Sequence, residues 1–134
     1  MIRVALNSDV AFIKNSWIRC VKNQYPHMYE FEFDERFGRY VCDVIDKANI
    51  HIYTFEEDIE QILAYLVFSV WNNNQIVHFA YTKEAARKKG YMNELLKHSN
   101  PDGKPVVFTT ATRNENIMQA LTKKYIYDPS MRWM

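Results

Sequence analysis

The sequence has few of the residues that build flexible connections. Its 134 residues include 3 Gly and 4 Pro, so long linkers between separate domains are not expected. Hydrophobic residues make up 48% and aromatic residues 15% of the chain, a composition typical of a packed core and not of a disordered segment. A chain of this length is sufficient for one such core. We therefore expect a single domain over residues 1–134.

Cysteine is equally scarce, and its positions argue against a metal site. The 2 cysteines, Cys20 and Cys42, each lie in a helical pattern beside large apolar residues. Neither has a second Cys or a His at the spacing of zinc ligands, so no metal is expected. Buried free thiols are the favoured interpretation, and a structural disulfide is the alternative.

The chain also lacks a strong net charge and a long apolar run. A formal net charge of +1 provides no general attraction for nucleic acid, so nucleic acid is not expected as a partner. No apolar stretch approaches the ~18 residues of a membrane span, and the first residues lack the apolar region of a signal peptide. These absences predict a soluble, cytoplasmic protein with no membrane partner.

What the sequence does contain is a strand pattern that leads through a basic turn into a helical pattern. Residues 76–82 are an apolar run rich in β-branched and aromatic side chains, as in a buried strand. The turn, residues 87–90, reads Arg-Lys-Lys-Gly, and the helical pattern covers residues 91–97. Cations at the positive end of a helix are unfavourable unless an anion binds there. The pattern predicts a phosphate site, and the alternative is a solvated basic surface.

The rest of the chain reads as strands and amphipathic helices around this stretch. Three asparagines at 72–74 predict a turn that joins two antiparallel strands. The expected strands are 2–6, 50–55, 61–71, 75–82, 106–110 and 125–127, and the expected helices are 10–23, 34–47, 91–97 and one that begins near Asn114. The fold class is therefore α/β (α+β), with a mixed, mainly antiparallel central sheet, flanking helices and the order β-α-α-β-β-β-α-β-α-β.

Two features resemble the GNAT (GCN5-related N-acetyltransferase) superfamily. Arg87-x-x-Gly90-x-Met92 resembles its Arg/Gln-x-x-Gly-x-Gly/Ala loop, with Met92 in place of the small last residue. The element order is the order of that superfamily over nearly the whole chain. The resemblance implies an acetyl-CoA-dependent N-acyltransferase, in which this loop binds the pyrophosphate and the preceding strand binds the pantetheine arm. The residues implied to bind acetyl-CoA are Phe79, Ala80, Tyr81, Thr82, Arg87, Lys88, Lys89, Gly90, Tyr91 and Met92.

Acetyl transfer to an amine also needs groups that move protons. His78 is the expected general base, because its ordinary pKa of ~6.5 suits proton transfer near neutrality. Tyr125 is the expected acid for the leaving thiolate. For both residues the alternative is a structural role in the sheet or the core. The acidic bend 56–60 and the residues Glu30 and Glu32 could attract a cationic amine without acting as a base.

An alternative function uses the same fold without catalysis. Met92, Gln75 at a position where family members often place an acid, and Leu121 where they often place a tyrosine favour a catalytically inactive GNAT-like protein. Such a protein would serve as a protein-interaction or viral accessory module, and compact GNAT-like proteins are encoded by bacteriophages. For the enzyme, the expected partner is an amine-bearing acceptor, either a small molecule or a protein. The expected state is a monomer or a homodimer, because the edge at 125–133 could pair with a second copy.

Overall fold

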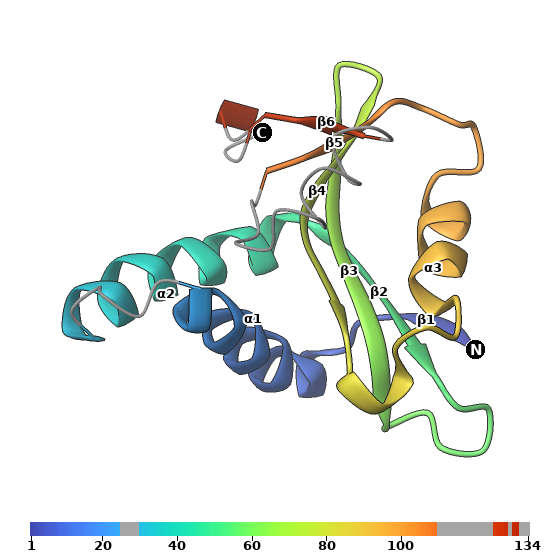
Figure 1. Ribbon diagram of the computed structural model, residues 1–134, viewed down its shortest axis with the longest axis horizontal. Helices are drawn as coiled ribbons and strands as arrows, with labels where there is room; N and C mark the ends of the chain where they lie inside the picture. The colour runs from blue at the N-terminus through green and yellow to red at the C-terminus, as the bar shows by residue number, and fades with distance from the viewer. Residues whose placement is uncertain (25–29, 110–124, 129, 132–134) are drawn as a thin grey trace.

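A computed structural model describes residues 1–24, 30–109, 125–128 and 130–131 (Figure 1). The strands are β1 (Ile2–Val4), β2 (Asn49–Thr54), β3 (Ile62–Trp71), β4 (Asn74–Thr82), β5 (Val106–Phe108) and β6 (Ile126–Tyr127). The helices are α1 (Val10–Gln24), α2 (Glu30–Lys47) and α3 (Tyr91–Ser99), and the short 3₁₀ turns are η1 (Asn7–Asp9) and η2 (Glu84–Ala86). The helix expected near Asn114 lies outside the described residues.

The strands form one sheet in chain order, from β1 to β6. Neighbours from β1 to β4 are antiparallel, whereas β4 pairs with β5, and β5 with β6, in parallel. Helix α3 makes the crossover between the parallel strands β4 and β5, as such pairs require. The predicted mixed, mainly antiparallel sheet with flanking helices is confirmed.

The β3–β4 hairpin shows why the asparagine turn was predictable. Asn72 and Asn73 have φ angles of 50° and 62°, and Trp71 pairs with Asn74. A two-residue loop with both residues left-handed continues the twist of the strands, and asparagine tolerates that conformation. The long apolar segment before it is a strand, and its first seven residues are buried.

The first strand ends earlier than the sequence predicts, because Asp9 turns the chain. The Asp9 carboxylate accepts a hydrogen bond from the backbone N–H of Leu6 at 2.7 Å. It also accepts two from the Arg3 guanidinium, at 2.7 and 3.0 Å. These contacts turn the chain after β1, and the turn η1 (Asn7–Asp9) leads into α1 at Val10. The second helix begins at Glu30 rather than Asp34, so Asp34 is not its cap.

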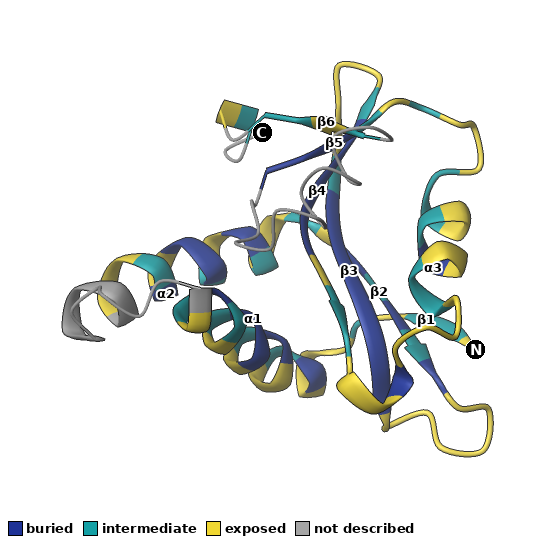
Figure 2. Ribbon diagram, in the orientation of Figure 1, coloured by how far each residue is buried: buried dark blue, intermediate teal, exposed yellow. Residues whose placement is uncertain are grey.

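The helices cover the two faces of the sheet unequally (Figure 1). Helices α1 and α2 lie on one face, here called the α1–α2 face, and α3 lies on the other, the α3 face. The core of the α1–α2 face contains the buried residues Ile13, Trp17, Val21, Tyr40, Val41, Val44, Ile50, Ile52, Ile62, Tyr65, Val67 and Phe79. The core of the α3 face contains Ala64, Leu66, Phe68, Val77, Leu95 and Phe108. Figure 2 shows both cores meeting at the buried strands β3 and β4.

The cysteines differ in part from the sequence-based expectation. Cys20 and Cys42 are both free thiols, as expected, but each is only half-buried. Both lie on the helices of the α1–α2 face. Burial raises the pKa of the Cys20 thiol, which keeps it protonated near neutral pH.

Candidate functional site

A β-bulge interrupts β4 at His78. Val77 pairs with Phe68 of β3 and Phe79 pairs with Val67, so two residues of β4 oppose one residue of β3 and His78 is the inserted one. A bulge of this kind bends a strand and disrupts its ladder locally. No sequence pattern marked it, because a bulge depends on the register with the neighbouring strand.

The sheet forks at the same point. β5 pairs only with Gln75, Ile76 and Val77 of β4, and the N–H of Thr109 reaches the carbonyl of Val77 at 3.2 Å. From Phe79 to Thr82, no other described strand lies along the outer edge of β4. The bulge and the fork together leave the outer edge of β4 from Phe79 to Thr82 without a strand partner among the described residues, and this edge is here called the slot.

The backbone of β4 alternates between β3 and this slot. The N–H of Lys83 donates to the carbonyl of Leu63 at 2.8 Å, so Lys83 is bonded to β3. In an antiparallel ladder every second residue points its backbone groups the other way, which directs those of Ala80 and Thr82 into the slot. Arg87 Nε donates to the Thr82 carbonyl at 3.3 Å. An extended ligand that carries amide groups could therefore bind this edge as an added strand.

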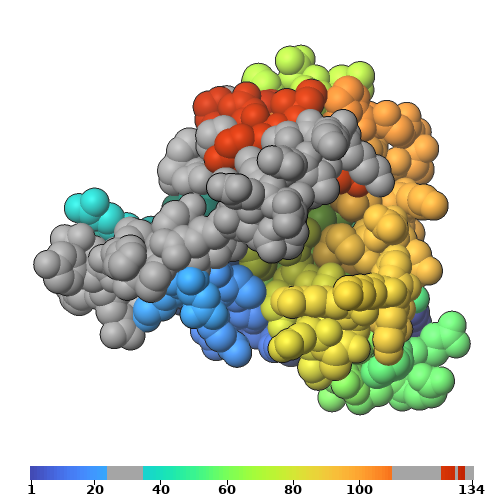
Figure 3. Space-filling model, viewed as in Figure 1, coloured from blue at the N-terminus to red at the C-terminus, as the bar shows by residue number. Residues whose placement is uncertain are grey.

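The slot ends at the basic turn that the sequence singled out. Lys88 and Gly90 are both left-handed, with φ angles of 66° and 79°, and Gly90 is the N-cap of α3. The first N–H groups of a helix have no partner within it and attract anions. Arg87, Lys88 and Lys89 are exposed, and a Cβ added to Gly90 would meet nothing within 4 Å. Figure 3 shows this connection, in yellow, at the border of a recess. The turn has the geometry and charge of a phosphate site.

Met92, the residue that departs from the small-residue pattern, does not fill the space before the turn. Its side chain is half-buried and packs against the core of the α3 face. Tyr91 also faces the sheet, where its ring stacks on Tyr53 with centroids 4.3 Å apart. The first turn of α3 therefore buries its large side chains and leaves its N-terminal end open.

His78 and Tyr125 lie on opposite faces of the sheet. His78 is 2% exposed, and its Nε2 atom lies 2.9 Å from Ser69 Oγ. Ser69 follows Tyr65 and Val67 at alternate positions of β3, which places it on the α1–α2 face. Tyr125 is half-buried against the core of the α3 face. The structure thus brings His78 to the bulge and leaves Tyr125 across the sheet from it.

The other sequence candidates are not gathered at the fork. Gln75 is 1% exposed, and its Nε2 donates to Ser99 Oγ at 2.7 Å, which ties β4 to the end of α3. The bend 56–60 is exposed, and Glu60 lines a cavity of about 480 Å³ together with Tyr81 and Lys83, at the C-terminal end of β4. The side chains of Glu30 and Glu32 lie outside the described residues.

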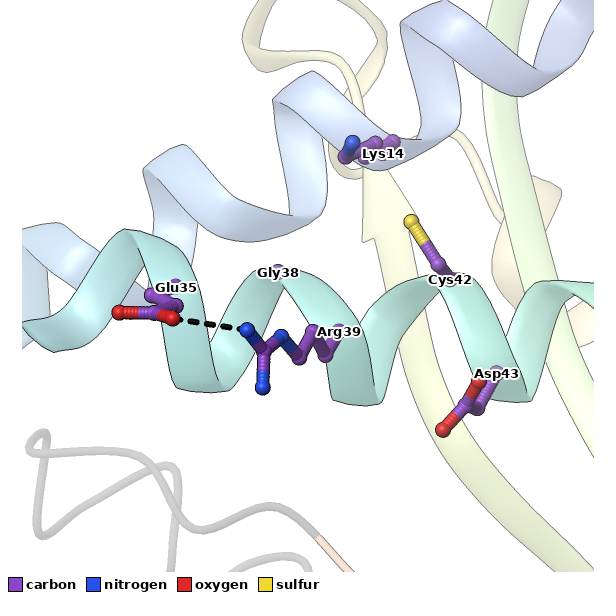
Figure 4. Close-up of a pocket in the computed structure, with 6 residues that line it drawn as sticks. All are labelled: Lys14, Glu35, Gly38, Arg39, Cys42 and Asp43. Carbon is purple, nitrogen blue, oxygen red and sulfur yellow. Dashed lines mark hydrogen bonds and ion pairs between the residues drawn. The ribbon is translucent and has the colours of Figure 1, made fainter.

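A second hollow lies between α1 and α2, away from the fork. It has a volume of about 420 Å³ and is lined by Lys14, Glu35, Gly38, Arg39, Cys42 and Asp43 (Figure 4). Within it, Arg39 and Glu35 form an exposed ion pair of 2.7 Å along one helix. Exposed pairs of this kind contribute little, and these side chains do not converge on one point (Figure 4).

Neither a metal-binding cluster nor a membrane-spanning helix is found in the part of the chain that the structure describes. Within it, no group of three or more His, Cys, Asp and Glu side chains is placed to hold a metal ion. Within the same residues, none of the helices combines the length and the apolar composition needed to cross a membrane.

Comparison with known proteins identifies the architecture. No family model matches the chain, and no curated protein matches it in sequence. Among solved structures, a "possible acetyltransferase" from Clostridium difficile 630 superposes with a TM-score of 0.66 at 18% identity, covering 96% of this chain and 90% of that one. A predicted acetyltransferase with acetyl-CoA from Clostridium acetobutylicum gives 0.61 at 14% identity, covering 92% and 86%. A GNAT family acetyltransferase from Brucella melitensis in complex with acetyl-CoA gives 0.55 at 16% identity, covering 87% and 79%. The six-stranded, forked sheet with its flanking helices is therefore the GNAT fold.

Proposed function

We propose that the chain is an acetyl-CoA-dependent N-acyltransferase, which transfers an acetyl group to an amine of a small-molecule or protein acceptor. One observation carries the proposal: the bulge and the fork meet at His78, and the slot they open leads directly to the cationic, left-handed turn before α3. Similarity to solved acetyltransferases, some with acetyl-CoA, supports it.

The residues present fit acetyl-CoA. Its pantetheine arm is a thin chain with two amides, which match the backbone groups that Ala80 and Thr82 direct into the slot. Its pyrophosphate is an anion, which matches the backbone amides of residues 88–92 and the charges of Arg87, Lys88 and Lys89. The thioester supplies an activated acetyl group, and holding that group beside an amine contributes much of the rate.

We assign the proton transfers to His78 and Tyr125, which lie on opposite faces of the sheet. An acyl group bound in the slot would lie between the α1–α2 face and the α3 face. We assign His78 the role of base for an amine that approaches from the α1–α2 face, and Tyr125 that of acid on the α3 face. The Ser69 hydroxyl can either donate or accept a hydrogen bond, so it can partner His78 Nε2 in both the neutral and the charged imidazole.

Calorimetric titration with acetyl-CoA tests the cofactor directly. We expect binding by the unmodified chain and its loss in Gly90→Glu, because glutamate strains a left-handed position and places a negative charge at the phosphate turn. Gly103→Glu is the matched control, since Gly103 is also left-handed, with φ 68°, and also has open space around it. No binding at ~1 mM acetyl-CoA, the upper end of the usual range of KM values, would reject the cofactor.

A second function follows from the polar groups that the fork buries. Gln75 is engaged with Ser99, and His78 is almost fully enclosed, which favours a GNAT-like interaction module without catalysis. A panel of amines incubated with acetyl-CoA separates the two functions through release of free thiol. The enzyme releases thiol with at least one amine, and this release falls in His78→Gln. The module leaves release at background and instead binds a specific protein partner.

A further inference from the structure

His78 is too enclosed to meet an acceptor amine directly. The residue is 2% exposed at the bulge of β4, and its Nε2 atom lies 2.9 Å from Ser69 Oγ. A general base must come within hydrogen-bond reach of the proton that it takes, either directly or through one bridging group. Direct contact would require the acceptor to enter the closed part of the sheet. A proton from the amine must therefore reach His78 through a neighbouring group.

Ser69 lies where the burial of β3 ends. Residues 62–68 are buried and Ser69 is half-buried, whereas Val70 and Trp71 are 48% and 45% exposed. Alternate residues of a strand point to the same face, so Ser69 and Trp71 share the α1–α2 face, where Ser69 contacts His78. Ser69 thus joins the enclosed imidazole to the more open end of that face.

The chemistry of a hydroxyl suits this intermediate position. A serine hydroxyl can donate one hydrogen bond and accept others at the same time. In the neutral tautomer of His78 that leaves a lone pair on Nε2, the Ser69 hydroxyl donates to that atom across the 2.9 Å contact. The Ser69 oxygen can then accept an N–H from a bound amine. Both protons can shift along these hydrogen bonds without movement of the two side chains.

We propose that Ser69 is a catalytic residue that relays a proton from the acceptor amine to His78; this inference rests on the proposed acetyl transfer. As the amine nitrogen bonds to the acetyl carbonyl carbon, an amine proton passes to Ser69 Oγ while the hydroxyl proton of Ser69 passes to His78 Nε2. The C–S bond breaks, and its electron pair leaves with the sulfur, which takes a proton from Tyr125. Ser69 is again a neutral hydroxyl. The His78 imidazolium then loses its proton to solvent, and Tyr125 regains one.

Thiol release from acetyl-CoA in the presence of the amine panel tests the relay. Ser69→Ala removes the hydroxyl and should lower kcat about 100-fold, the lower end of what proton transfer by a positioned group contributes. Calorimetry should show unchanged binding of acetyl-CoA, because Ser69 lies outside the slot. Ser69→Thr keeps a hydroxyl at the same carbon and should restore most of the rate. The Ser69→Ala/His78→Gln double variant should be no slower than His78→Gln alone, because both residues serve one transfer.

Ser16→Ala is the matched control. Ser16 is 3% exposed, and its Oγ lies 2.8 Å from the Tyr65 hydroxyl in the core of the same face. The Tyr65 hydroxyl also donates to the carbonyl of Ile13 at 3.1 Å, so it keeps a partner when Ser16 is replaced. This variant removes a serine hydroxyl from the α1–α2 face without touching His78, and it should leave the rate of thiol release unchanged.

Rates in mixtures of H₂O and D₂O separate a relay from a serine that only orients His78. Protons that move together through Ser69 give a curved dependence of the rate on the deuterium fraction, whereas a single transfer gives a straight line. A straight line for the unmodified chain, an unchanged rate in Ser69→Ala, an equal loss in Ser16→Ala or a further loss in the double variant overturns this inference alone. No thiol release by the unmodified chain with any amine overturns the proposed catalysis and this inference together.

Discussion

The two faces of the sheet are held by different kinds of contact. On the α1–α2 face, the Trp17 indole stacks flat on Phe79, with centroids 5.2 Å apart and planes within 6°. On the α3 face, a 9-residue helix is joined to the sheet partly through polar pairs, Gln75 with Ser99 and His51 with His98. Apolar packing is insensitive to pH and salt, whereas polar pairs respond to both. The helix that carries the proposed phosphate site is thus the more adjustable one.

Trp17→Ala should give the largest loss of stability and test the packing of the α1–α2 face. The indole is 0% exposed, and removing a buried tryptophan costs about 3–5 kcal/mol through lost burial and the cavity left behind. Urea unfolding of the unmodified chain and of Trp17→Ala measures the difference in unfolding free energy. Trp71→Ala is the control, because Trp71 is 45% exposed and should change stability by ~0.5 kcal/mol or less. Equal effects of the two substitutions would mean that this face is not held by packing.

Asp9→Ala should cost less, about 2 kcal/mol, since it removes a helix-start hydrogen bond and leaves Arg3 without its partner. The hydrogen bond from Arg3, and then that from Leu6, lower the pKa of Asp9 below its ordinary 3.8. A lowered carboxyl pKa stabilises the fold above the unfolded value and loses that contribution as pH falls through the folded value. The difference between the two chains should therefore begin to shrink below pH ~4 and shrink further as pH falls toward the lower folded value, and a difference that stays constant over that range would contradict the assignment.

The smallest expected effect on stability concerns His51. It tests the α3 face through the pH dependence of the unfolding free energy. Burial, and then the nearby charge of His98, lower the pKa of His51; the two rings are 5.4 Å apart. A histidine with a lowered pKa stabilises the fold at neutral pH and loses that contribution as pH falls below the unfolded value of ~6.5. Unfolding free energy should therefore decline between pH 7 and 5, less steeply in His51→Leu. Parallel pH profiles for the two chains would remove His51 as the cause.

These two titrations separate the faces on one pH axis. As pH falls, the His51 contact beneath α3 weakens first, below pH ~6.5, and the Arg3–Asp9 ion pair at the start of α1 weakens only below pH ~4. Amide exchange at pH 5.5 should accordingly rise in α3 before it rises in α1. The opposite order would reverse the comparison between the two faces.

Much of the fold was predictable from local pattern. The apolar run of β3, the asparagine turn and the strand–turn–helix of residues 75–97 each carry their signal in neighbouring residues, so their positions agree with the structure to within a few residues. The basic turn was also predictable, because three cations and a glycine before a helix are an unusual local combination. The end of β1 was not predictable, because it depends on the hydrogen bonds that Asp9 accepts from Leu6 and Arg3.

The missing parts of the site depend on contacts between distant residues. The bulge at His78 arises from the register of β4 on β3, and the fork arises from where β5 leaves β4. The burial of Met92 against the sheet follows from how α3 docks. Tyr53 and Tyr91, whose rings stack, lie far apart in sequence, and each alone has an ordinary context. No single-sequence pattern contains these relations.

The fork also limits what can enter. An exposed strand edge usually invites pairing with the edge of another sheet, but this edge lies inside its own sheet and closes where β5 rejoins β4 at Val77. Among the described residues, the unpaired part of this edge runs only from Phe79 to Thr82. Very short edges are one way in which proteins limit edge-to-edge pairing, so the fork leaves little edge for a strand of another molecule.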